Sequence, residues 1–89
     1  MWKIVYKPSV KKDFRNITSE MASIIRQVIE EKLMTDPVKY GIPLRRTLKG
    51  YMKLRIGSYR IVYSIEHKKV TVHVIKIAHR KDVYRGLEK

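Results

Sequence analysis

Three cations, Lys53, Arg55 and Arg60, flank a Gly-Ser dipeptide at positions 57–58. That dipeptide fits a two-residue hairpin turn with glycine first, as a type II′ turn requires. The turn would pair Arg55 with Arg60 and place Lys53 two residues away on the same face. Like charges directly opposite in a sheet are destabilising, and a bound phosphodiester would offset the repulsion by accepting charge-assisted hydrogen bonds. The alternative is a solvated face whose cationic side chains splay apart.

An imidazole, a phenol and several cations lie close together near the end of the chain, in the segment His79-Arg80-Lys81-Asp82-Val83-Tyr84-Arg85. Unstacked RNA bases lie against aromatic rings while phosphates contact Arg or Lys, so this mixture of side chains suits RNA. The plainer interpretations are that Tyr84 covers the core from a short terminal helix and that His79 is a surface residue.

The sequence offers little else for catalysis. The histidines at positions 67, 73 and 79 have neither cysteines nor paired carboxylates beside them, so no metal site is expected. No glycine-rich phosphate loop and no nucleophile elbow is present in the sequence. Any catalysis would therefore need no metal or cofactor and would use cations together with one or two weak acids or bases.

The net charge of +13 is unevenly distributed along the 89 residues. Residues 1–37 carry a net charge of +2, whereas residues 38–89 carry +11, with no acidic residue between Asp36 and Glu66. Same-sign crowding opposes folding, so this asymmetry favours a dedicated anionic partner. A generally basic surface is the alternative.

Length and composition are typical of one small domain, residues 1–89, that folds but gains stability from a partner. The absence of cysteine excludes disulfides, thiolate catalysis and cysteine-based zinc sites. The apolar runs are too short to span a membrane, and the first residues lack the hydrophobic region of a signal peptide. We therefore expect a cytoplasmic protein without a membrane partner.

Local patterns in the first half predict the elements that support these side chains. Residues 2–6 are rich in aromatic and β-branched side chains and predict an opening strand. Ser9 begins a short helix, and apolar residues spaced by three and four after Thr18 predict a second one that ends at Asp36, before a proline. Residues 37–50 contain two prolines and two glycines and predict a loop.

Two-fold alternation in the second half predicts strands over residues 51–56, 59–65 and 70–78. A second two-residue turn at 67–68 would pair Glu66 with Lys69. The predicted fold class is α+β: a small single domain with an antiparallel sheet of about four strands, two N-terminal helices packed on one face and a short C-terminal helix.

Three stretches together resemble the RelE branch of the RelE/ParE toxin superfamily: Leu48-Lys49-Gly50, the run from Lys53 to Tyr63 (KLRIGSYRIVY), and His79-Arg80-Lys81-Asp82-Val83-Tyr84. The resemblance covers nearly the whole chain, because the opening strand, the helix pair and the Asp-Pro exit occur in the same order. It implies a small basic toxin paired with a RelB-like antitoxin. It further implies that the protein cuts mRNA in the ribosomal A site, without metal, by attack of the ribose 2′-OH on the adjacent phosphate.

The same resemblance implies roles for individual residues. Arg60 and Arg80 would stabilise the phosphate, with Arg80 or His79 near the leaving group. Tyr84 would position or stack the nucleotide, and Lys53 or Tyr84 would assist deprotonation of the 2′-OH. Further contacts to RNA are expected from six side chains: Arg45, Arg46, Lys49, Arg55, Lys81 and His73.

Two departures qualify these expectations. Tyr51 stands where RelE proteins often have a second basic residue, so acid–base roles can differ from those of the best-known members. Strand alternation would carry Arg80 to the apolar face, so a bulge or turn near Ala78 is required to bring it beside Arg60.

Two other functions stay open at this point. One is a ParE-like toxin that poisons DNA gyrase through protein contacts and cuts no RNA. The other is a nucleic-acid-binding module without catalytic activity, whose binding would depend steeply on salt.

Overall fold

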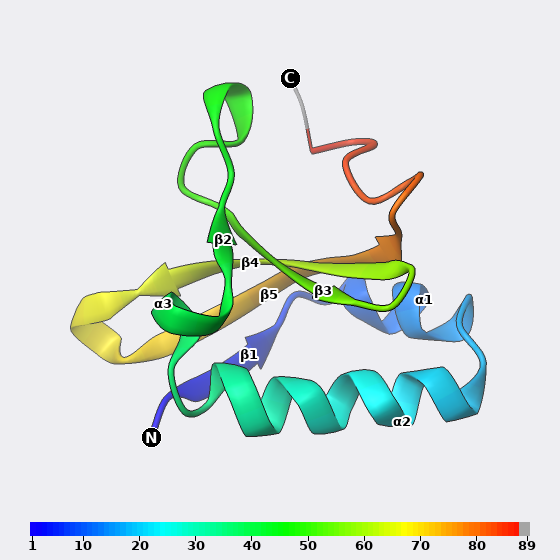
Figure 1. The fold of residues 1–89 in the computed structure, drawn as a ribbon, viewed down its shortest axis with the longest axis horizontal. Helices are drawn as coiled ribbons and strands as arrows, with labels where there is room; N and C mark the ends of the chain where they lie inside the picture. The colour runs from blue at the N-terminus through cyan, green and yellow to red at the C-terminus, as the bar shows by residue number, and fades with distance from the viewer. Residues whose placement is uncertain (88–89) are drawn as a thin grey trace.

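A five-stranded sheet forms the centre of the computed structural model, which describes residues 1–87 (Figure 1). The strand order is β1-β5-β4-β3-β2. The strands are β1 (Lys3–Tyr6), β2 (Ile42–Pro43), β3 (Met52–Ile56), β4 (Tyr59–Glu66) and β5 (Thr71–His79). The helices are α1 (Val10–Arg15), α2 (Ser19–Val28) with its π-helical continuation η1 (Ile29–Leu33), α3 (Pro37–Tyr40), and the short 3-10 turns η2 (Arg46–Leu48) and η3 (His67–Lys69).

The hydrophobic core lies between the sheet and the α2–η1 helix, which runs along one face of the sheet (Figure 1). Ile25, Ile29 and Leu33 are fully buried at the helical spacing that the sequence predicted, against Ile61 and Val74 of the sheet. The side chain of Thr18 caps α2, and the helix ends before Pro37 as expected. The predicted α+β class is confirmed. No helix within residues 1–87 is long and apolar enough to cross a membrane.

The β3–β4 hairpin has the predicted register, in which Ile56 faces Tyr59 and Arg55 faces Arg60. Gly57 adopts a left-handed conformation with φ of 57°, which suits glycine at this tight turn. The turn therefore determines which residues of the two strands share a face.

The sheet differs from the prediction in strand number and direction. It is mixed rather than antiparallel, because β1 pairs in parallel with β5, with Lys3 facing Thr71 and Tyr6 facing Val74. A fifth strand, β2, lies within the predicted loop and pairs with β3. Two residues, one of them a proline at a sheet edge, are too few to show a strand pattern in the sequence.

The β4–β5 connection is longer than the predicted two-residue turn. Glu66 faces Thr71 rather than Lys69, and η3 and Val70 form the connection between them. Val70 adopts a left-handed conformation with φ of 48° and is exposed, whereas the sequence predicted that it begins the last strand. The shift amounts to two residues, so Val72 and Val74 still point into the core.

The segment after β5 consists of successive turns rather than the predicted short helix. His79 O accepts the amides of both Asp82 and Val83, but the next bonds, from Arg85 to Asp82 and from Leu87 to Tyr84, span three residues only. Continuous α-helical bonding is therefore absent from residues 80–87. Fully buried Val83 holds this segment to the rest of the protein.

Candidate functional site

Lys53, Arg55 and Arg60 share the sheet face that lies away from α2, and we call this surface the basic face. The register shows it directly, because Arg55 faces Arg60 and Lys53 faces Val62 on the adjacent strand. Arg55 is exposed, and the other two cations are partly exposed. Val62 is fully buried although it lies on this face. The three cations therefore share one face, as the turn at 57–58 predicted, whereas the burial of Val62 among them was not predicted.

The guanidinium of Arg60 is held in place by the hairpin turn. Its Nη1 donates hydrogen bonds to the carbonyl oxygens of Gly57 and Tyr59, both at 3.0 Å. A guanidinium has five N–H donors in a rigid plane, so the remaining donors can still reach an anion. The turn thus orients Arg60 before any ligand arrives.

The backbone of Arg80 reaches the turn beside the basic face because β5 contains a bulge. Val62 of β4 faces Lys76, whereas the next residue, Tyr63, faces Val74, so Ile75 has no partner on β4. The extra residue inverts the alternation and places Ala78 opposite Arg60. The Arg80 amide then donates to Ser58 O at 2.8 Å, beside the β3–β4 turn. The sequence predicted a bulge or turn near Ala78, and the structure has the bulge three residues earlier, at Ile75.

His79 lies on the opposite side of the sheet from Arg60. It faces Tyr59 in the register, and the two rings meet edge to face with their centroids 5.9 Å apart. Its Nδ1 accepts the Lys81 amide at 3.2 Å, which in a neutral ring leaves the proton on Nε2. The structure therefore separates this imidazole from Lys53 and Arg60.

Two segments rise on the side of the sheet away from α2 and flank the basic face (Figure 1). One is the C-terminal segment 80–87, in which Tyr84 is partly buried and Lys81 is exposed. The other is the 44–50 loop, where the exposed cations are Arg45, Arg46 and Lys49. Arg46 adopts a left-handed conformation with φ of 57°, a strained state for a residue other than glycine, while buried Leu48 anchors the loop.

His73 lies away from the other candidate residues. It faces Ser64, four residues along β4 from Arg60, which corresponds to about 13 Å of strand. Its Nε2 lies 2.9 Å from Glu66 Oε1, and this hydrogen bond lowers the pKa of the Glu66 carboxyl. His73 is thus engaged with a local carboxylate near the β4–β5 connection.

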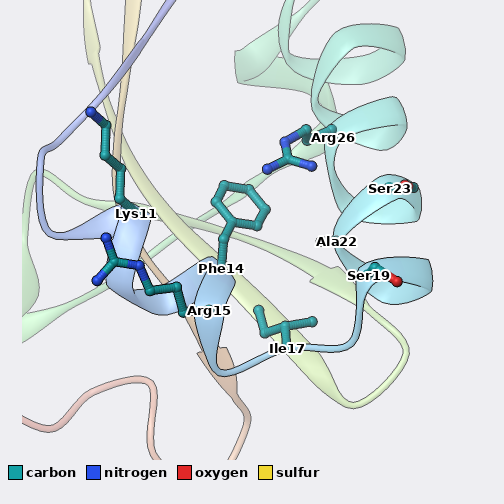
Figure 2. A pocket seen from close by; sticks show the side chains of 8 residues that line it. All are labelled: Lys11, Phe14, Arg15, Ile17, Ser19, Ala22, Ser23 and Arg26. Carbon is teal, nitrogen blue, oxygen red and sulfur yellow. The ribbon is translucent and has the colours of Figure 1, made fainter.

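A separate hollow of about 520 Å³ lies between α1 and α2 (Figure 2). Phe14, Ile17 and Ala22 form its apolar part, and Arg26 lies over the Phe14 ring at 4.3 Å from the centroid. Lys11 and Arg15 of α1 also line it, whereas no acidic side chain does. The hollow exists because α1 packs chiefly on β5 rather than on α2. The sequence predicted only that the two helices pack on one face of the sheet, so the hollow between them was missed.

Metal-binding chemistry has no evident location in the part of the chain that the structure describes. Within residues 1–87, no three His, Asp or Glu side chains are grouped closely enough to hold a metal ion. The charged groups that the strand register brings together on the basic face are guanidinium and ammonium.

Comparison with known sequences identifies relatives along most of the chain. The family described as "ParE toxin of type II toxin-antitoxin system, parDE" matches residues 4–84. Toxin RelG of Mycobacterium tuberculosis is 29% identical over 80 residues, covering 90% of this chain and 92% of that protein. Toxin RelE of the same organism is 32% identical over 74 residues, covering 83% of this chain and 76% of that protein.

Solved structures show the same fold. The toxin–antitoxin complex RelBE2 from M. tuberculosis contains a chain that matches with a TM-score of 0.84 and 25% identity, over 89% of this chain and 98% of that one. The intact RelBE complex of E. coli matches with a TM-score of 0.72 and 21% identity, over 89% of this chain and 96% of its own. Because the family match spans nearly the whole sequence and the fold agrees, the chain belongs to the ParE toxin family of type II toxin–antitoxin systems, within the RelE/ParE superfamily.

Proposed function

We propose that the protein is a toxin that inhibits translation by cutting mRNA in the ribosomal A site. The observation that carries this proposal is the Arg55–Arg60 pair on the basic face, with Lys53 on the same face and Arg80 at the adjacent turn. A phosphodiester is an economical ligand for such a group, because each cation can donate a charge-assisted hydrogen bond to it. Similarity to toxins named RelE and RelG supports this class of activity. Its place of action is the cytoplasm, where mRNA is translated.

The reaction is an attack of the ribose 2′-OH on the adjacent phosphate, which expels the 5′-oxygen of the next nucleotide. Negative charge builds up on the phosphoryl oxygens, and fixed cations stabilise it without reorganisation. Arg60 suits this role because the hairpin turn already orients it. Arg80 is the second stabilising cation. This reaction needs no metal or cofactor.

Proton transfer completes the reaction. The leaving 5′-oxygen takes up a proton as it departs, and Arg80, at the turn beside the basic face, is assigned to this position in preference to His79 on the other side of the sheet. Lys53 or Tyr84 assists removal of the 2′-OH proton. Tyr84, partly buried in the C-terminal segment, also provides a ring on which a base can stack.

Exposed cations around the basic face bind the phosphates of mRNA and of ribosomal RNA. They are Arg55 of the basic face itself, Lys81 of the C-terminal segment, and Arg45, Arg46 and Lys49 of the flanking loop. His73 contributes at most an outlying contact, because Glu66 already holds it. Binding of this kind weakens as salt rises, since counterions are released from the RNA.

The partner that silences the toxin is a RelB-like antitoxin. Related toxins were solved in complexes with antitoxins, which supports a partner of this kind. Two surfaces here suit a segment that is both acidic and apolar: the basic face, and the hollow beside Phe14 with its basic rim. An antitoxin that wraps the domain can occupy both.

Induced expression in bacteria tests the class of activity. The expected result is growth arrest with a rapid fall in amino-acid incorporation and new 5′ ends within translated mRNA. Gyrase-dependent DNA breaks without mRNA cuts would instead assign the gyrase-poisoning function suggested by the ParE family name. RNA binding without growth arrest would indicate a module that has no catalytic activity.

A further inference from the structure

Asp13 forms a long-range contact that the proposed reaction does not use. Its Oδ2 accepts the backbone amide of Ile77 at 2.9 Å, although the two residues are 64 positions apart. Asp13 is partly buried on α1, and no ion pair to it is present among residues 1–87. The carboxylate is therefore used as a backbone acceptor.

The contact occurs where β5 loses its outer neighbour. Parallel pairing with β1 stops at Tyr6 and Val74, and the Lys7 amide donates to Val74 O at 2.9 Å as the last bond of that ladder. The amide of Ile77 lies beyond this point and would lack a strand partner on that side. Asp13 supplies the missing acceptor.

The contact also lies directly after the bulge. Ile75 is the extra residue, and Ile77 is the first core residue after it, 1% exposed. In a straight strand, Lys76, Ala78 and Arg80 would point toward the core like Val74. The bulged register turns them to the basic face and carries Arg80 to the turn at Ser58. Hydrogen bonds to Val74 and Ile77 hold β5 on both sides of the extra residue.

We infer that Asp13 is a positioning residue for Arg80: its carboxylate fixes the bulged register of β5 that places Arg80 on the basic face. Only the effect of Asp13 on mRNA cleavage depends on the proposed function. Its effect on the register is a property of the folded chain alone.

Three substitutions separate the role of the acceptor from that of the charge. Asp13→Ala removes the acceptor, Asp13→Asn keeps a carbonyl oxygen in nearly the same place without the charge, and Asp13→Glu keeps the charge but displaces the oxygen. Ile25→Val, a mild core truncation far along the sequence from the bulge, is the control for lost stability. If Asp13→Ala does not fold, Asp13→Glu replaces it in both measurements as the variant with a displaced acceptor.

NMR decides the structural part of the inference. In the wild type and in Asp13→Asn, we expect the Ile77 amide to be protected from exchange and cross-strand contacts to join Ala78 to Arg60. In Asp13→Ala, exchange at Ile77 should accelerate at least about tenfold and these contacts should weaken, while Ile25→Val keeps both. Unchanged contacts and protection in Asp13→Ala would overturn the inference, even if the protein proves not to cut mRNA.

A double-mutant cycle decides the functional part. Asp13→Ala should slow mRNA cleavage by about 100-fold, the scale of a displaced catalytic group, and Asp13→Asn should stay within about threefold of the wild type. In the Arg80→Ala background, Asp13→Ala should cause no further loss. An equal loss in both backgrounds would show that Asp13 does not act through Arg80. Failure of the wild type to cut mRNA would refute the proposed function and leave the NMR result as the test of the register.

Discussion

Arg55 lies directly opposite Arg60 across the β3–β4 pair, on a face where Lys53 is also present. Repulsion among these three cations lowers folding stability. Within residues 1–87, no Asp or Glu side chain forms an ion pair with any of them to offset it. A protein retains such a destabilising cluster of cations when the cluster binds an anion. Stability and RNA binding should therefore change in opposite directions when one of these charges is removed.

The first prediction concerns Arg55→Thr. The substitution should raise the free energy of unfolding by roughly 0.5 kcal/mol at low salt, because it removes one like-charge contact. The gain should shrink in 1 M salt, whereas a gain from β-propensity alone would persist. RNA binding should weaken, and the negative slope of log K against log salt should become shallower by about 1. Urea unfolding and salt-dependent RNA titrations measure both effects. An unchanged salt slope would remove Arg55 from the RNA contacts.

The second prediction concerns the buried phenol of Tyr63, whose hydroxyl donates to Pro37 O at 2.6 Å. Burial, and then the nearby Asp36 carboxylate, raise the pKa of Tyr63 to about 12 from its ordinary 10.0. Because the folded state favours the neutral phenol, its contribution to stability is complete below pH 10 and is lost as the pH rises toward 12.

Comparison with Tyr63→Phe isolates the contribution of this one hydroxyl from that of every other group in the protein. At pH 8 the wild type should be more stable by about 1–3 kcal/mol, because the variant leaves Pro37 O without its donor. That advantage should shrink by about 1.4 kcal/mol per pH unit between pH 10 and 12. A constant difference across this range would contradict the raised pKa.

The third prediction is that Val70→Gly stabilises the protein. Val70 holds φ of 48°, is 45% exposed, and uses its backbone in bonds to His67 and Lys3 that glycine can also make. A left-handed conformation costs a β-branched residue about 1–2 kcal/mol, part of which glycine recovers. Thermal unfolding should show a gain of about 0.5–1 kcal/mol. Val70→Ala, which keeps a Cβ, should gain less, and equal gains would show that the backbone is not strained.

The fourth prediction tests the hollow between α1 and α2 as an antitoxin contact. Arg15→Glu places a carboxylate on its basic rim and should weaken binding of the co-expressed antitoxin by about tenfold or more. Lys12→Glu changes an exposed cation on the same helix that does not line the hollow, and should have little effect. Both variants should still cut mRNA. If both variants lost antitoxin binding equally, net charge rather than the hollow would determine the affinity, and the prediction would be wrong.

Local chemistry explains why the β3–β4 hairpin and the helical part of the core could be predicted. The Gly57-Ser58 turn sets the pairing of its neighbours, and the spacing of Ile25, Ile29 and Leu33 requires one buried helix face. The parallel β1–β5 pairing depends on residues nearly seventy positions apart, which leave no local pattern. Val70 could not be predicted as a turn residue, because its conformation opposes its intrinsic preference.

The basic face was predictable for the same reason, since it follows from the turn. The position of His79 was not. The bulge at Ile75 reverses the alternation of every later residue in β5, so it brings Arg80 toward Arg60 and turns His79 away. Asp13, the residue inferred to fix this bulge, lies 64 positions before Ile77, so its contact with β5 exists only in the folded chain.

Mapping of 5′ ends on ribosomes programmed with a defined mRNA tests the central claim most directly. Purified wild-type protein should cut within the A-site codon and leave the same mRNA intact when ribosomes are omitted. Arg80→Ala should reduce the rate by at least about 100-fold. Arg85→Ala, a matched control on an exposed side chain that pairs with Asp82 at 3.4 Å, should cut at the wild-type rate. Absence of A-site cuts by the wild type, or unchanged cutting by Arg80→Ala, would contradict the account.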